Sequence, residues 1–232
     1  MLAVITAGFA PGLALLSYFY LRGPENDEPV TKIGKSFVSG AILVFPLMFI
    51  QYVFQTEGLL QETWQDAFLL SALLEEFFKW FILFFTVYQH VSFDRHYEGI
   101  IYAAAVSLGF ATVENVLYLF QFGIDVAFGR ALLPVSSHAL FGVVMGYYAG
   151  KAKTGPGKLE KRYLLLALTV PVLLHGTYDF ILLTFSKYWP VLMTPFMFYL
   201  WWNALRKVKM ANRRQPDWNQ NLDGAKKIET GS

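Results

Sequence analysis

The stretch Leu73-Leu-Glu-Glu-Phe-Phe-Lys-Trp80 places two acids and a lysine inside an apolar run from Ala67 to Tyr88. A run of this length is enough to cross a bilayer as a helix, which needs about 20 residues. Each ionisable side chain at membrane depth costs a few kcal/mol unless it is paired or hydrated. The run therefore predicts a membrane-spanning helix, and its three charged residues become candidates for function.

The composition of the whole chain is that of a membrane protein. Of the 232 residues, 55% are hydrophobic and only 16% are charged, and the mean hydropathy is +0.40. These values are far from those of an ordinary soluble domain. The absence of cysteine excludes disulfides, thiolate metal sites and a cysteine nucleophile. A net charge of +2 gives no indication of nucleic-acid binding.

Seven apolar runs predict an all-α fold, a polytopic transmembrane helix bundle of about seven spans. The predicted spans are Leu2–Leu21, Phe37–Phe54, Ala67–Tyr88, Gly99–Gln121, Ala131–Gly150, Tyr163–Phe185 and Trp189–Leu205. We expect residues 1–205 to form one transmembrane domain. Residues 206–232 are polar, and we expect them to form a disordered tail.

The basic residues predict the orientation of the chain. Sixteen of them fall in the connections after the first, third and fifth spans and in the tail, whereas the opposite side has only Arg130 and Lys187. By the positive-inside rule, the N-terminus lies outside and the tail is cytoplasmic. The prediction is a multi-pass protein of the cell membrane in contact with the lipid bilayer. Lys79 is counted on neither side, because it lies inside the predicted third span.

Polar side chains on four predicted spans lie at one depth. They are Glu75, Glu76 and Lys79 on the third span, Glu114 and Asn115 on the fourth, His138 on the fifth, and His175 and Asp179 on the sixth. Counted from the predicted outer ends at 1.5 Å per residue, they lie about 9–15 Å below the outer surface. We therefore expect them to face one another. Small residues at Gly109, Gly142, Gly146 and Gly176 would allow the helices to approach closely.

The spacing within each span defines pairs. Lys79 follows Glu75 by four residues and Glu76 by three, so the lysine can neutralise either acid but not both. His175 and Asp179 are also four apart, so Asp179 could orient the imidazole or stabilise its charged form. Four acids against one lysine leave the group over-acidic. This excess favours a glutamate that acts as a general base.

Four ordered motifs carry a family resemblance. EEFFK (Glu75–Lys79) fits E-E-x-x-K, FATVEN (Phe110–Asn115) fits F-x-x-x-E-N, HALFG (His138–Gly142) fits H-x-x-x-G, and HGTYD (His175–Asp179) fits H-x-x-x-D. The set resembles the PrsW family of bacterial intramembrane proteases, which are distant relatives of the CAAX-processing and abortive-infection membrane proteases. Glu98 and Ala103 stand where that family commonly has Asp and Gly.

The resemblance implies that residues 1–205 form a protease domain in the bacterial plasma membrane. It also implies site-1 cleavage of a single-span anti-sigma factor, a step of a stress response. We expect hydrolysis by a water molecule that Glu76 or Glu75 activates. His175 and His138 would position that water, protonate the leaving amine or hold the oxyanion, and Lys79 would tune the two glutamates.

The supporting residues have two interpretations. Glu114 and Asn115 could form interhelical hydrogen bonds, as polar residues often do in membranes. Asn115 could equally stabilise an oxyanion. Asp179 is expected to support His175. Another group, His90, Asp94, His96 and Glu98, falls in a predicted cytoplasmic connection, where a solvated loop is the simpler interpretation.

Three alternatives to a glutamate-activated protease remain: a zinc-dependent protease, a transporter, and a structural or sensory protein. The glutamate mechanism needs no metal, and the positive charge of Lys79 would repel a divalent ion held by the neighbouring glutamates. A zinc-dependent protease would instead use His138, His175 and Glu76 as ligands of Zn²⁺. A proton- or cation-coupled transporter would use the same acids as a relay, although no inverted repeat is evident. A purely structural or sensory membrane protein is the fourth interpretation.

Overall fold

The computed structural model describes residues 1–23, 28–89 and 93–213, and every element in these ranges is helical. The long helices are α1 (Leu2–Leu21), α2 (Val30–Thr56), α5 (His96–Phe122), α7 (Ser136–Thr154), α8 (Glu160–Thr184) and α9 (Trp189–Arg213). Between α2 and α5 the chain forms α3 (Thr63–Gln65), η1 (Asp66–Leu73), α4 (Leu74–Leu83) and η2 (Phe84–Tyr88). Between α5 and α7 it forms η3 (Ile124–Val126), α6 (Ala127–Arg130) and η4 (Ala131–Val135), and η5 (Gly157–Leu159) precedes α8. The all-α prediction is confirmed for these residues.

Five helical segments are long and apolar enough to cross a membrane. They are Leu2–Leu21, Val30–Thr56, His96–Phe122, Ile124–Thr154 and Gly157–Thr184. The other two predicted spans are also helical, but the segment from Asp66 to Tyr88 is divided into π- and α-helical stretches, and neither it nor α9 is among the five. The chain is thus a multi-pass membrane protein, and the count of seven spans stays a prediction.

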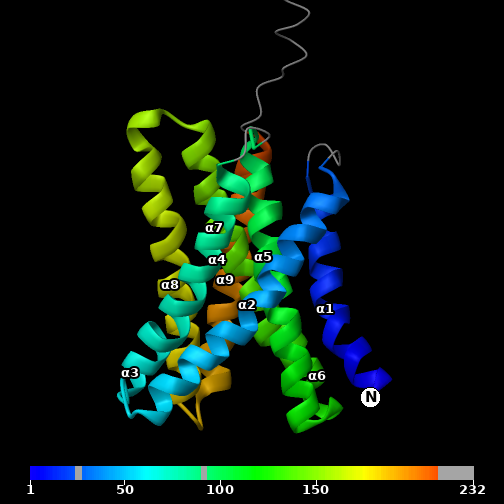
Figure 1. Cartoon of the computed structure of the whole chain (residues 1–232), viewed down its shortest axis with the longest axis vertical. Coiled ribbons are helices and arrows are strands. Elements are labelled where there is room, and N and C mark those ends of the chain that lie inside the picture. The colour runs from blue at the N-terminus through cyan, green and yellow to red at the C-terminus, as the bar shows by residue number, and fades with distance from the viewer. Residues whose placement is uncertain (24–27, 90–92, 214–232) are drawn as a thin grey trace, which may run out of the picture.

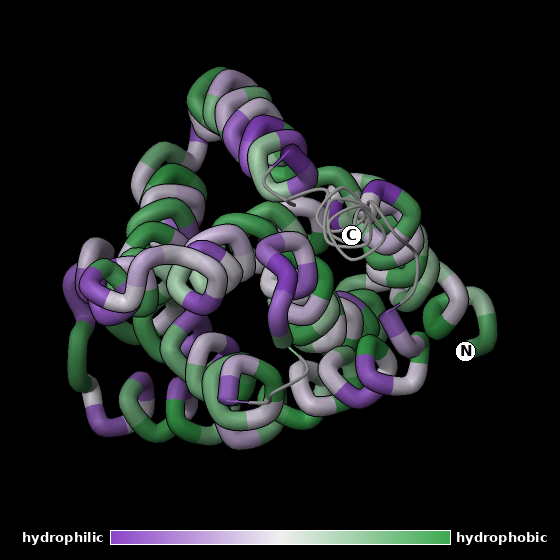
Figure 2. The backbone as a smooth tube through the Cα atoms, turned by 90° about the horizontal axis from the view of Figure 1, so that it is seen from above, coloured by the Kyte–Doolittle hydropathy of each residue, from purple (hydrophilic) through white to green (hydrophobic). Residues whose placement is uncertain are grey.

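The helix ends gather at two opposite ends of the molecule. The end of α1, the connection between α7 and α8 and the end of α9 lie at the top of Figure 1, whereas the N-terminus, α3 and α6 lie at the bottom. The basic residues Arg22, Lys158 and Arg213 therefore lie at one end and Arg130 at the other. Hydrophilic residues mark the helix ends that face the viewer in Figure 2, and hydrophobic residues cover much of the remaining helix surface.

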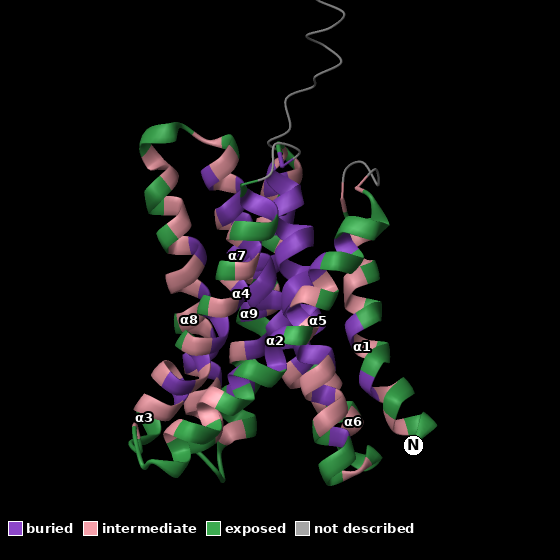
Figure 3. Cartoon of the chain, viewed as in Figure 1, coloured by how far each residue is buried: buried purple, intermediate pink, exposed green. Residues whose placement is uncertain are grey.

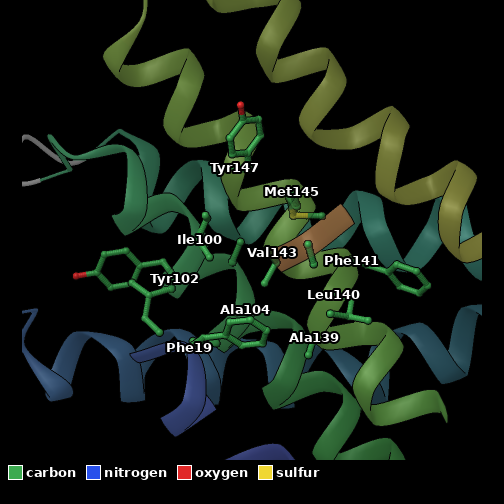
Figure 4. Packing of buried hydrophobic residues seen from close by; sticks show 14 of the residues in the cluster. Phe19, Ile100, Tyr102, Ala104, Ala139, Leu140, Phe141, Val143, Met145 and Tyr147 are labelled. Atoms are coloured by element: carbon green, nitrogen blue, oxygen red, sulfur yellow. The ribbon is translucent and has the colours of Figure 1, made fainter. Parts of the chain in front are cut away.

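Helices α5 and α7 form the centre of the bundle. They carry most of the buried residues, whereas α1 and α3 are largely exposed or half-buried (Figure 3). Figure 4 shows the two helices meeting through small and branched side chains such as Ala104, Ala139 and Val143. Such side chains let two helices approach closely in a bilayer, where packing rather than hydrophobic exclusion drives association.

Glycines set the distance between α5 and its neighbours. A Cβ atom at Gly146 of α7 would overlap the carbonyl oxygen of Gly99, and a Cβ at Gly109 of α5 would overlap the carbonyl oxygen of Phe37 on α2. At Gly176 of α8 it would overlap the ring of Phe68. The neighbouring atoms leave no room for a side chain at these positions, so the expected role of these glycines in close helix approach is confirmed.

Two of the site-bearing helices are π-helical just before their ionisable residues. The stretch η1 ends at Leu73, two residues before Glu75, and η4 ends at Val135, three residues before His138. Pro134 lies within η4 and lacks the N–H that an α-helical bond at that position would need. Widened turns of this kind are frequent at functional sites, because they shift the direction of the side chains that follow.

Two segments differ from the sequence-based expectation. The interpretation of His96 and Glu98 as a solvated loop is wrong, because both are buried at the start of α5, where Glu98 accepts hydrogen bonds from Arg95 and from the backbone of Asp94. His90 lies outside the described residues. Helix α9 continues past Leu205 to Arg213, and the part of the predicted tail from residue 214 onward also lies outside them.

Candidate active site

Four ionisable side chains from three helices meet inside the bundle. Glu75 and Glu76 lie on α4, His138 on α7 and His175 on α8, and one ligand atom from each lies within 4.8 Å of all the others. All four residues are buried, and Glu76 has no exposed surface. The structure thus brings together the four residues that the sequence placed at one depth.

Lys79 lies among them and bonds to three of the four. Its Nζ atom is 2.8 Å from Oε1 of Glu76, 3.3 Å from Oε2 of Glu75 and 3.2 Å from Nδ1 of His138. An ammonium group has three hydrogens to donate, and these three acceptors use them all. The ring of Phe110 lies 4.2 Å from Nζ on another side. The spacing of three and four residues placed either glutamate within reach of the lysine, and in the structure the lysine contacts both.

His138 connects this group to a second ion pair. Its Nε2 atom lies 3.1 Å from Oε2 of Glu114, while its Nδ1 atom faces the Lys79 ammonium. A neutral imidazole with its proton on Nε2 satisfies both contacts, because it donates to the carboxylate and accepts from the lysine. Glu114 in turn accepts a hydrogen bond from Nη2 of Arg130 at 3.0 Å.

Arg130 is a site residue that sequence reasoning missed. Besides its contact with Glu114, it donates from Nε to Oδ1 of Asn115 at 2.9 Å, and its guanidinium lies 3.9 Å from the centre of the Tyr118 ring. The sequence offered one signal, because Arg130 is one of only two basic residues on its side of the chain. That rarity was interpreted only in terms of membrane orientation.

Asn115 connects Arg130 to helix α1. Its side-chain nitrogen donates to the carbonyl oxygen of Gly8 on α1 at 3.1 Å, and its oxygen accepts from Arg130. Both ends of the amide are therefore engaged between helices. This geometry favours the interhelical interpretation of Asn115 over a role as oxyanion donor.

His175 lies between two acids. Its Nδ1 atom is 3.0 Å from Oε1 of Glu76, and its Nε2 atom is 3.3 Å from Oδ2 of Asp179, one turn along α8. Asp179 also accepts a hydrogen bond from the hydroxyl of Ser71. The imidazole stacks on the ring of Phe141 with ring centres 5.1 Å apart. Asp179 therefore orients His175, as its spacing predicted.

The two adjacent glutamates have different surroundings. Both oxygens of Glu75 have partners, since Oε2 accepts from Lys79 and Oε1 accepts from the amide of Gln51 on α2 at 3.3 Å. Glu76 accepts from Lys79 and His175 through Oε1 alone, and its buried Oε2 has no hydrogen-bond partner among the described residues. Gln51 was also missed, although a glutamine within an apolar run was a signal.

The donor set suits a divalent metal ion. Two imidazoles and two carboxylates, all buried and within 4.8 Å of one another, are ligands that Zn²⁺ takes in catalytic sites. The unpartnered Oε2 of Glu76 supplies an acceptor that nothing else in the described part of the chain uses. Lys79 contacts three of the four donors, so the ammonium and a metal ion would compete for the same atoms.

Comparison with known proteins places these residues in context. The sequence model of the PrsW-protease family, described as a PrsW family intramembrane metalloprotease, matches residues 28–204. The chain is 56% identical to Protease PrsW of Bacillus subtilis (strain 168), covering 91% of this chain and 96% of that protein. It is 54% identical to Protease PrsW of Geobacillus kaustophilus, covering 91% and 93%, and 30% identical to Protease PrsW of Clostridioides difficile, covering 92% and 94%. No solved structure matches the chain.

Proposed function

The chain belongs to the PrsW family of intramembrane proteases and is a membrane peptidase, and from that premise we propose that it cuts single-span membrane proteins at the group formed by Glu75, Glu76, His138 and His175. One observation carries the proposal. Glu76 is fully buried between Lys79 and His175, and one of its oxygens is left free to accept a proton. The transporter interpretation of the same acids is set aside, because the family is one of proteases.

In the proposed reaction, water attacks the carbonyl carbon of the scissile peptide bond. Oε2 of Glu76 accepts a proton from that water, since it is the buried carboxylate oxygen without a partner in the described residues. The carbon–nitrogen bond then breaks as the leaving amine takes a proton from the His175 imidazole. The proton held by Glu76 passes to His175, whose Nδ1 lies 3.0 Å from the same carboxylate, so both groups return to their starting states. Lys79 keeps the adjacent negative charges of Glu75 and Glu76 from destabilising each other.

The outer residues keep the inner ones in place. Arg130 and Glu114 fix the orientation and tautomer of His138, and Asp179 and Ser71 fix the orientation of His175. Partners of this kind hold reactive groups in one geometry, and correct positioning of the reacting groups lowers the barrier of the reaction. The two histidines therefore face the glutamates from fixed directions.

A metal ion would be held by His138, His175 and Glu76, with Glu75 beside them. When bound, such an ion supplies Lewis-acid activation of water and of the peptide carbonyl. With Glu76 engaged in that way, the role of proton acceptor would pass to Glu75, which Gln51 holds from α2. The opposing observation is Lys79, whose ammonium already lies among the same donors and favours the route without metal.

The substrate class follows from the resemblance and from the location of the site. A single-span anti-sigma factor of the bacterial plasma membrane, cut on its extracytoplasmic side in a stress response, is the substrate that the PrsW family resemblance implies. Seven spans with the N-terminus outside would place the four residues in the outer half of the bilayer. The chain would then act as a site-1 protease.

Reconstitution tests the proposed function. Purified wild-type protein in lipid nanodiscs is mixed with a panel of single-span reporters, anti-sigma factors among them, and the products are sequenced by mass spectrometry. We expect one cut on the extracytoplasmic side and none with Glu76→Gln, provided that the variant keeps the helical circular dichroism of the wild type. Equal cleavage by wild type and a folded Glu76→Gln variant would contradict the proposal.

A separate measurement tests whether hydrolysis requires a bound metal ion. Elemental analysis of purified protein and cleavage assays after chelation distinguish the two routes. No stoichiometric metal and unchanged cleavage after chelation would support the glutamate route. One Zn²⁺ per chain, with activity removed by chelator and restored by zinc, would support the metal route and leave the peptidase assignment in place.

A further inference from the structure

A polar cavity of about 300 Å³ lies at the end of the molecule that carries α3. Its walls come from the end of α2, the segment that follows it, the start of η1 and the end of α8. The side chains that matter for its chemistry are Gln55, Gln61, Thr63 and Asp66. A volume at the lower end of ligand pockets suits a single side chain better than a whole ligand.

Two of the helices that line this cavity, α2 and α8, also carry a residue that binds the candidate active site, four positions from the lining residue. On α2, Gln55 lines the cavity and Gln51 binds Glu75. On α8, Leu183 lines it and Asp179 binds His175. Leu70 of η1 lines it as well, and the carbonyl oxygen of Leu70 accepts a hydrogen bond from the same Gln51. The cavity therefore lies on the same helices as the residues that bind Glu75 and His175, toward that end of the bundle.

The cavity carries a negative charge without a partner. The carboxylate of Asp66 forms no hydrogen bond or ion pair with any residue in the described part of the chain. At the same end, Arg130 is already bonded to Glu114 and Asn115, and Lys187 lies exposed in the connection between α8 and α9. The charged group that acts on Asp66 is another carboxylate, that of Asp179, which repels its negative form.

We infer that this cavity is a specificity subsite, and that Asp66 binds an arginine or lysine side chain of the substrate just outside the bilayer. The inference rests on the proposed peptidase function and adds to it a requirement on the sequence of the substrate. The glutamines and the threonine in the walls can accept the remaining hydrogen bonds of a guanidinium or ammonium group.

The geometry also predicts the position of the basic residue. Asp66 precedes Glu75 by nine residues on one helical segment, which corresponds to about 13 Å in an α-helix and somewhat less where the turns are π-helical. An extended peptide covers roughly 3.3 Å per residue. The basic side chain would therefore lie about three to four residues from the cut bond, on the extracytoplasmic side.

The test uses a single-span reporter that the wild type cuts, with Arg, Gln or Glu placed at each of the eight positions outside the cut bond. Wild type should favour Arg over Gln roughly tenfold in kcat/KM at the third or fourth position, mainly through KM. Asp66→Asn should remove this preference, and Asp66→Arg should favour the reporter with Glu. The matched control is Asp125→Asn, since Asp125 is an exposed acid at the same end that does not line the cavity.

A binding measurement separates this inference from the proposed function. The inactive Glu76→Gln variant in nanodiscs is titrated with fluorescent Arg, Gln and Glu reporters. A preference for Arg that Asp66→Asn abolishes supports the subsite even if the wild type cuts no reporter. Cleavage and binding that are equal for Arg, Gln and Glu at every position, with and without Asp66, would overturn the subsite while leaving the peptidase assignment intact.

Discussion

The Nζ atom of Lys79 lies 2.8 Å from Oε1 of Glu76, and neither side chain has any exposed surface. Glu76 is one of two adjacent acids, and Glu75 also accepts from the same ammonium. Removal of one partner from a buried ion pair leaves an uncompensated charge in a medium that solvates it poorly. The stability of the bundle therefore depends on Lys79.

The first prediction concerns Lys79→Met. We expect the variant to lose about 3–5 kcal/mol of unfolding free energy, because two buried carboxylates lose their cation. Added Zn²⁺ should restore part of the loss, since a divalent ion can take the place of the ammonium among the same donors. Thermal unfolding in detergent, with and without zinc, measures both effects. A variant as stable as the wild type would show that Lys79 is not the counter-ion of the two glutamates.

Much of this site could be predicted from the sequence, because charges in apolar runs have few interpretations. The convergence of Glu75, Glu76, His138 and His175 was expected from helix rise and span boundaries alone, and the spacing of Lys79 placed either glutamate within its reach. The contacts of Arg130, Gln51 and Ser71 could not be predicted in this way. They depend on the rotation of each helix about its axis, which the π-helical turns of η1 and η4 alter without any clear sequence signal.

The second prediction concerns Arg130, which contacts Glu114 but none of the four central residues in the described structure. Arg130→Gln should lower kcat roughly 10- to 100-fold, as is typical when a group that orients a reactive residue is lost. The KM should change little, and Arg130→Lys should recover part of the activity through its remaining charge. Lys187→Gln is the matched control, because Lys187 is the other basic residue of that end and is exposed. Equal kcat in Arg130→Gln and wild type would remove Arg130 from the site.

The third prediction concerns the contact between α5 and α7. Gly146→Ala should destabilise the protein by about 1–3 kcal/mol, because the new Cβ atom meets backbone rather than a movable side chain. Gly129→Ala in α6 is the control, since a Cβ there meets nothing within 4 Å. The control should be neutral or slightly stabilising, because alanine favours a helix over glycine by about 1 kcal/mol. Thermal unfolding compares the two, and equal melting temperatures would contradict the close packing of these helices.

The fourth prediction concerns pH and the proposed subsite. Burial raises the pKa of the Asp66 carboxyl above its usual range, and the nearby Asp179 carboxylate raises it further. The negative form binds a basic side chain, so the preference for Arg over Gln reporters should be fully present only well above this raised pKa. The preference should disappear as the pH falls through this raised pKa, which is at a higher pH than for an aspartate with the ordinary pKa. Other groups at the site also titrate, so the ratio of Arg to Gln cleavage at each pH is the quantity to measure. A ratio that stays constant down to the ordinary pKa of aspartate would count against Asp66 as the anion.

The fifth prediction is the topology. Seven spans with the N-terminus outside place Lys187 outside and Lys158 in the cytoplasm, and both side chains are exposed. The native chain has no cysteine, so Lys187→Cys and Lys158→Cys can each be labelled alone. An impermeant maleimide applied to intact cells should label Lys187→Cys, and Lys158→Cys only after the cells are opened. The reverse pattern would invert the orientation, and it would place the candidate active site in the inner half of the bilayer.

The role of Glu76 in hydrolysis is tested most directly by cleavage of one reporter in H₂¹⁸O by wild type, Glu76→Gln and Glu57→Gln in parallel. Glu57 is an exposed acid outside the candidate site, so its variant controls for the substitution itself. We expect wild type and Glu57→Gln both to cut a single bond and to place ¹⁸O in the new carboxyl group, whereas folded Glu76→Gln gives no product. Labelled product formed by Glu76→Gln at the rate of the wild type would contradict this role of Glu76.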